Sequence, residues 1–127
     1  MRDLYSATID IDEDRVLLVK FKDRVEVEIE EAVKLVDVSL EIVDNQSFYL
    51  LVDARDIFSS MDHESRKYIS DHKRYNELNI AQAIVVNNMP IRLLASAYFR
   101  MYKHVNPIKI FTNITDARKW LLKQTKA

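Results

Sequence analysis

Hydrophobic and polar residues alternate near the beginning of the chain. Apolar side chains occupy positions 5, 7, 9 and 11, which is the two-residue period of a half-buried strand. A second, mostly apolar run follows at 16–21, and the polar residues 12–15 between the two segments are typical of a turn. The pattern therefore predicts an antiparallel hairpin.

The period of the pattern then lengthens to that of a helix. Apolar residues recur at steps of three, four and seven between Ile29 and Val43, so we expect an amphipathic helix that ends near Asp44. Three further helices are expected, over 60–77, over 90–103 and from 113 onwards. Asn113 can cap the last of them, with Asp116 three residues later as an approximate capping box.

Short apolar runs separate the helical segments. They lie at 48–52, 81–86 and 108–111 and are typical of strands buried on both faces of a parallel sheet. The predicted order is β-β-α-β-α-β-α-β-α. We therefore expect an α/β fold in a single domain over 1–127, with an open, mostly parallel sheet of about five strands and flanking helices. Only the opening hairpin is expected to be antiparallel.

Two residue types are missing from the composition. The chain has no cysteine, which excludes disulfides, thiolate zinc sites, iron–sulfur clusters and a cysteine nucleophile. It also has no glycine, which excludes the P-loop, the G-x-G-x-x-G motif, the G-x-S-x-G elbow and the EF-hand loop. Many common nucleotide and catalytic motifs are thus excluded, and we expect no cofactor.

Charge is balanced over the whole chain but uneven along it. The net charge is −1, whereas residues 1–31 carry −5 and residues 98–127 carry +6. Either the elements simply differ in surface charge, or a charge dipole orients self-association. The balance is atypical of a nucleic-acid binder. No run approaches the ~20 apolar residues of a membrane span, and the first residues lack the apolar core of a signal peptide, so we expect a cytoplasmic protein.

Short motifs in three parts of the chain resemble the STAS domain family of anti-sigma-factor antagonists. They are LLVDAR at 50–55, ESRKY at 64–68, and a C-terminal pattern of Phe111-Thr112, Asp116-Ala117 and Trp120-Leu121. The element order matches as well, and the chain looks most similar to small, single-domain bacterial proteins described as STAS/CRAL-TRIO-like. The resemblance implies a non-enzymatic role in protein–protein regulation; some relatives bind nucleotides or lipids.

The phosphorylation motif of the antagonists is replaced in this chain. Those proteins carry a phosphorylatable serine at the start of the second helix, in an Asp-Ser-Ser-Gly motif. Here residues 59–63 read Ser-Ser-Met-Asp-His, and counting from Asp53 places the phosphoserine position on His63. A kinase-controlled Ser59 or Ser60 is therefore not expected.

Polar residues gather where the predicted parallel strands end. Ligands of open α/β sheets bind beyond the carboxyl ends of the strands, and two predicted helix N-termini favour an anion there. The candidate ligand-binding residues are Asp53, Arg55, Ser59, Ser60, Asp62, Asn87, Asn88 and Arg92. Arg92 is suited to a carboxylate or phosphate. Alternatively, Ser60 or Asp62 caps the next helix, the asparagines turn the chain, and Arg92 pairs with an acidic residue.

The segment 90–103 is apolar around nearly its whole circumference, which is typical of a helix buried on more than one side. One interpretation is a homodimer or partner surface. Its candidate residues are Leu94, Tyr98, Met101 and Tyr102. The alternatives are that neighbouring helices cover the segment, or that it closes an apolar slot lined by Tyr98, Phe99 and Tyr102.

Neither a metal site nor a catalytic site has a strong signal. The three histidines are His63, His72 and His104; the first two lie on different sides of a straight helix, and His72 belongs to its core-facing stripe. Ser60 and His63 are close in sequence, but their spacing matches no known triad. We therefore expect a non-enzymatic, cytoplasmic regulatory or interaction module that self-associates. The alternative is a small protein that binds an anion, a nucleotide or a lipid.

Overall fold

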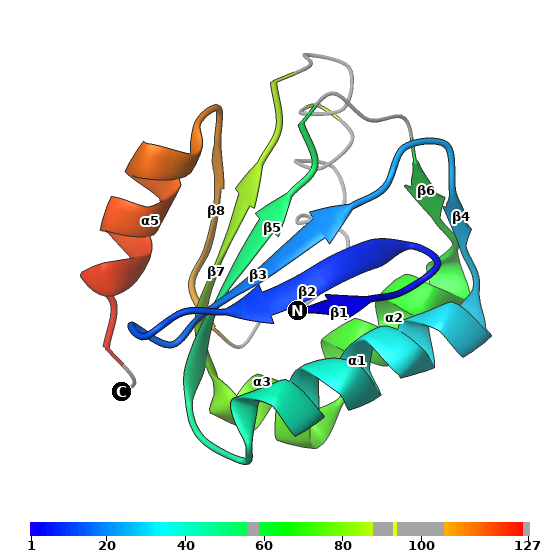
Figure 1. The fold of residues 1–127 in the computed structure, drawn as a ribbon, viewed down its shortest axis with the longest axis horizontal. Helices are drawn as coiled ribbons and strands as arrows, with labels where there is room; N and C mark the ends of the chain where they lie inside the picture. The colour runs from blue at the N-terminus through cyan, green and yellow to red at the C-terminus, as the bar shows by residue number, and fades with distance from the viewer. Residues whose placement is uncertain (56–58, 88–92, 94–105, 126–127) are drawn as a thin grey trace.

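The computed structural model describes residues 1–55, 59–87, 93 and 106–125 (Figure 1). Within them, the main sheet has the strand order β1-β2-β3-β5-β7-β8. The strands are β1 (Arg2–Asp3), β2 (Ala7–Ile11), β3 (Val16–Phe21), β5 (Phe48–Asp53), β7 (Asn79–Val85) and β8 (Ile108–Phe111). Pairings from β3 to β8 are parallel, which confirms the predicted α/β architecture.

The predicted mostly parallel sheet of about five strands is confirmed, but a second antiparallel pair lies at its edge. The main sheet has six strands, because Arg2 and Asp3 turn back to pair with Ile9 and Thr8. Both β1–β2 and β2–β3 are antiparallel. Two exposed polar residues form β1, so no apolar alternation marks it in the sequence.

Helices cover both faces of the sheet (Figure 1). On one face lie α1 (Ile29–Val43), α2 (His63–Asp71) and α3 (Lys73–Leu78), and on the other lies α5 (Ile114–Leu122). Neighbouring residues of each central strand point to opposite faces. Leu17 and Leu50 belong to the core under α1, whereas Val16 and Leu51 belong to the core under α5. This two-sided burial explains the continuous apolar runs.

Helix α5 packs on small side chains. Ala81 and Ala83 of β7 and Ala117 of α5 are completely buried. The Trp120 ring lies 5.7 Å from that of Phe111 and extends this core to β8. Small residues at a contact let a helix approach the sheet closely, and α5 uses this over its nine residues.

A second, two-stranded sheet was missed by the sequence pattern. Strand β4 (Glu26–Val27) pairs in parallel with β6 (Ser60–Met61) and joins the start of α1 to the start of α2. The helix expected over 60–77 is consequently two helices. The first begins at His63, after β6, and ends at Asp71; the second begins after His72.

The predicted helix over 90–103 lies outside the described residues except for Leu93. Leu93 is helical, and 63% of it is exposed. In the part of the chain that the structure describes, no helix has the length and apolar character needed to cross a membrane.

Candidate functional site

Asp53 and Arg55 form a closed ion pair at the carboxyl end of β5. Asp53 is 5% exposed. The Arg55 backbone N–H and Nε donate to its Oδ1 at 3.1 and 3.0 Å, and Nη2 donates to Oδ2 at 3.1 Å. Burial alone would raise the pKa of Asp53, but these hydrogen bonds and the Arg55 charge outweigh burial and lower it. The Asp53 carboxylate is therefore ionised, and both of its oxygens are hydrogen-bonded to Arg55.

Ser59 joins β4 and β6 to the end of β3. Its hydroxyl donates to the Lys22 carbonyl and accepts from the Val25 backbone N–H at 3.1 Å. Ser60 lies opposite Glu26 in the short parallel ladder and is exposed. Both serines thus lie on the segment that carries β6 into α2.

Asp62 caps α2, as one of the sequence alternatives had it. Its carboxylate accepts from the Ser65 backbone N–H at 2.8 Å. Hydrogen bonds from Ser65 lower the pKa of Asp62. The Ser65 hydroxyl in turn donates to the Val27 carbonyl at 3.3 Å, which ties the helix start to β4.

The remaining predicted site residues are only partly described. Asn87 is exposed just beyond the end of β7. Asn88 and Arg92 lie outside the described residues, as do the proposed interface residues Leu94, Tyr98, Met101 and Tyr102. The structure therefore brings Asp53 to Arg55, and places Ser59, Ser60 and Asp62 along β6 and the start of α2.

His72 has a structural role at the junction of α2 and α3. Its Nδ1 accepts from the Tyr75 backbone N–H at 3.1 Å, and its ring packs edge-on against Tyr68. His63 is exposed at the start of α2, and His104 lies outside the described residues. Across the described ranges, no three His, Cys, Asp or Glu side chains are grouped to hold a metal ion.

A cavity of about 180 Å³ lies between α1, α2 and the sheet, and sequence reasoning missed it. Its described lining is mostly apolar, with four polar residues among it. The apolar lining residues are Val19, Phe21, Leu35, Val36, Leu50, Val52, Met61, Ile69 and Ile84. The polar ones are Ser39, Arg66, Tyr75 and Gln82. The one available signal was Gln82, a polar residue inside the apolar run 81–86.

Two of the polar lining residues are already hydrogen-bonded within the core. The Ser39 hydroxyl donates to the Leu35 carbonyl at 2.6 Å. Burial raises the pKa of Tyr75 far above its ordinary value, although a hydrogen bond with Ser39 opposes the shift. Tyr75 therefore stays neutral at physiological pH, and its ring packs on Phe48 with centroids 5.4 Å apart.

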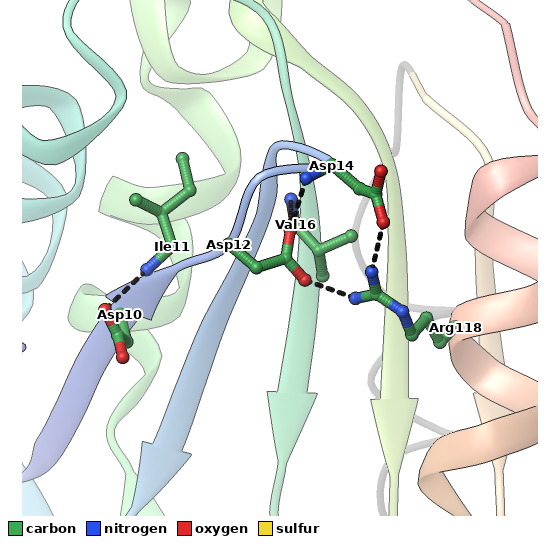
Figure 2. Close-up of polar contacts among 6 residues, drawn as sticks. All are labelled: Asp10, Ile11, Asp12, Asp14, Val16 and Arg118. Atoms are coloured by element: carbon green, nitrogen blue, oxygen red, sulfur yellow. Dashed lines mark hydrogen bonds and ion pairs between the residues drawn. The ribbon is translucent and has the colours of Figure 1, made fainter.

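A second polar cluster lies at the opposite end of β3. Arg118 of α5 donates to the carboxylates of Asp12 and Asp14, the latter at 2.6 Å (Figure 2). The other Asp12 oxygen accepts from the backbone N–H groups of Asp14 and Val16 at 2.9 and 3.0 Å. Burial alone would raise the pKa of Asp12, but the hydrogen bonds from Val16 and Arg118 outweigh it and lower the pKa. This cluster, the Arg118 clamp, holds the β2–β3 turn to α5.

One family model and one solved structure place this chain among known proteins. A family model described as a domain of unknown function, DUF7793, matches residues 9–125. Among solved structures, the chain is similar to an uncharacterised DUF3478-family protein from Shewanella loihica PV-4 with a SpoIIAA-like fold. The two chains are 15% identical, 95% of this chain and 98% of that chain are covered, and the TM-score is 0.67. No curated protein matches. The SpoIIAA-like fold of that protein confirms the fold that the resemblance to STAS domains implied.

Proposed function

The chain belongs to the DUF7793 family and has a SpoIIAA-like fold, and from this premise we propose that it is a non-enzymatic interaction module that associates with a second copy of itself. A regulatory role through protein contacts requires a binding surface and no catalytic group, so a fold of this kind can perform it. The fold alone assigns no partner, so the proposal depends on how the polar residues and the surface are used.

One observation carries the proposal: three of the described polar side chains at the carboxyl edge serve the fold. Asp53 is bound by Arg55, Ser59 bridges Lys22 and Val25, and Asp62 caps α2. A nucleophile needs a base within hydrogen-bonding reach, and a capping carboxylate that accepts from a backbone N–H is poorly placed for proton transfer. These bonds favour a binding role over catalysis.

Leu93 supports a contact surface on the segment 90–103. It is one of four large hydrophobic residues that are exposed within the described ranges, and 63% of it is accessible. Its neighbours in sequence, residues 91–102, are largely apolar. Apolar surface of that kind is stabilised when a partner covers it.

The test is the molecular mass of the purified protein in solution, by native mass spectrometry and light scattering. We expect a dimer of the 15.0-kDa chain at micromolar concentration. Leu93→Glu places a charge in the proposed contact and should raise the dimer dissociation constant by at least about tenfold. The matched control is Leu122→Glu, at an exposed leucine of α5, which should leave the mass unchanged. A protein that remains monomeric at high micromolar concentration would refute self-association.

A further inference from the structure

We infer that the cavity between the sheet and helices α1 and α2 is a binding site for a small amphipathic carboxylate of about ten non-hydrogen atoms, since its volume slightly exceeds that of apolar cavities known to take benzene. This inference is independent of the proposed self-association. It rests on a void, on the size of that void, and on two polar groups in its wall.

The void is local, because the other face of the same strands is tightly packed. Val16, Leu51 and Ala83 on the α5 side are at most 3% exposed. Val52 and Ile84, which point to the α1–α2 side, remain only half-buried. Protein interiors are normally packed as densely as organic crystals, and side chains that border a void lose dispersion contacts. A ligand that fills the cavity restores those contacts and stabilises the fold.

The volume of the cavity limits the size of the ligand. At about 180 Å³ the cavity is close to an engineered apolar cavity of about 150 Å³ that binds benzene, and below the ~300 Å³ of the smallest drug-sized pockets. A nucleotide or a two-chain lipid is too large to enter completely. A medium-length aliphatic chain or a single aromatic ring fits.

Gln82 gives the cavity a polar wall in an unusual place. It lies in the middle of β7, between Leu50 and Ile108 of the neighbouring strands. Its side-chain amide forms no hydrogen bond within the described residues, and the space it borders is the cavity. Gln82 is half-buried, so its amide can be reached from the cavity, and its N–H groups can donate to the oxygen of a ligand that enters there.

Arg66 supplies the charge that selects an anion. It lines the cavity from α2, one turn after Asp62, and lowers the pKa of that carboxyl by its charge. Arg66 has a further interaction of its own. The guanidinium carries five N–H donors, and its geometry matches a carboxylate. An apolar body in the cavity with its carboxylate toward Arg66 uses both features.

The experiment uses octanoate, which has ten non-hydrogen atoms, and its neutral analogue 1-octanol. Calorimetry and thermal unfolding of the full chain should show saturable one-to-one binding of octanoate, at least tenfold tighter than binding of 1-octanol. Arg66→Gln should remove that preference while leaving 1-octanol binding within twofold, because only the charge is lost. Hexadecanoate should bind no more tightly than octanoate, because the cavity volume limits the chain length.

A cavity-filling variant separates the site from general surface binding. Val52→Phe adds bulk inside the cavity and should abolish binding of both probes, with an equal or higher melting temperature. Leu18→Phe, on the opposite face of the neighbouring strand, is the control and should bind octanoate normally. Absence of saturable binding to folded wild-type protein would overturn the site. Equal affinity for octanoate and 1-octanol, unaffected by Arg66→Gln, would overturn the carboxylate assignment.

Discussion

At the scale of single residues, a chain without glycine must use other residues wherever its backbone is left-handed. Four residues have positive φ in the described part of the chain: Arg15 at 66°, Arg24 at 58°, Asp44 at 53° and Asn45 at 58°. A left-handed conformation costs an L-residue roughly 1–2 kcal/mol, less for Asp and Asn. Arg15 offsets this cost, because its guanidinium donates to the carbonyls of Val43, Gln46 and Ser47.

Arg24 and Arg15 should therefore respond in opposite ways to glycine. Arg24 is exposed, and its guanidinium lies 3.6 Å from the carboxylate of the adjacent Asp23. Arg24→Gly should raise the free energy of unfolding by about 0.5–1 kcal/mol, because relief of the left-handed strain exceeds the added entropy of the unfolded chain. Arg15→Gly should lower it by about 1–2 kcal/mol, because three hydrogen bonds are lost. Urea unfolding measures both. A destabilised Arg24→Gly would show that its backbone carries no strain.

At the scale of elements, the apolar periodicity predicted the longer helices and strands and missed the strands of two residues. The helix at 29–43 and the buried strands were predicted correctly, since each presents several apolar residues at a regular spacing. Strands β1, β4 and β6 have two residues each, too few for any period to show. The break at His72 was missed because the apolar stripe continues through it, whereas the imidazole accepts from the Tyr75 N–H and starts a new helix.

Helix α5 begins with a capping interaction between Asn113 and Asp116. Asn113 accepts from the Asp116 backbone N–H at 2.8 Å, and its own amide donates to the Asp116 carboxylate at 2.9 Å. Asn113→Ala should destabilise the protein by about 1 kcal/mol, because the first turn of the helix loses its cap. Thr115→Ala, an exposed change in the same turn, should lie within about 0.5 kcal/mol of wild type. Chemical denaturation compares the two, and an equal loss would contradict a specific role for the cap.

At the scale of the whole molecule, sequence reasoning located an edge but not a cavity. The carboxyl edge was predicted because the strand ends can be read along the chain, and Asp53 and Arg55 do meet there. The described lining of the cavity comes from four strands and three helices, so no local pattern marks it. The opposite charges of the two ends of the chain meet, in part, inside one molecule, through Arg118 with Asp12 and Asp14.

The Arg118 clamp should make stability depend on pH in a defined direction. The pKa of Asp12 is lowered in the folded state. The ionised carboxylate therefore stabilises the fold at pH values above its ordinary pKa of 3.8, and this stabilisation is lost as the pH falls through the lowered pKa of the folded protein. Arg118→Ala should cost about 0.5–1 kcal/mol at pH 7, because the pair is partly exposed, and progressively less as the pH falls below 3.8. Lys119→Ala is the control and should show no such convergence. Unfolding curves at several pH values test this, and a cost that stays constant with pH would exclude the clamp.

The strand order has a consequence for biosynthesis. Each strand of the main sheet lies next to the strand that precedes it within that sheet, from β1 through β8. The ribosome therefore delivers the strands in the order in which they are laid side by side, and each newly made strand finds its docking edge already formed. Among the described elements, α5 comes last and packs on the far face, where its Arg118 reaches the turn made at the beginning (Figure 1). Until α5 emerges, Leu51, Ala81 and Ala83 lack the helix that they pack against in the finished fold, and apolar surface exposed during synthesis is what chaperones protect.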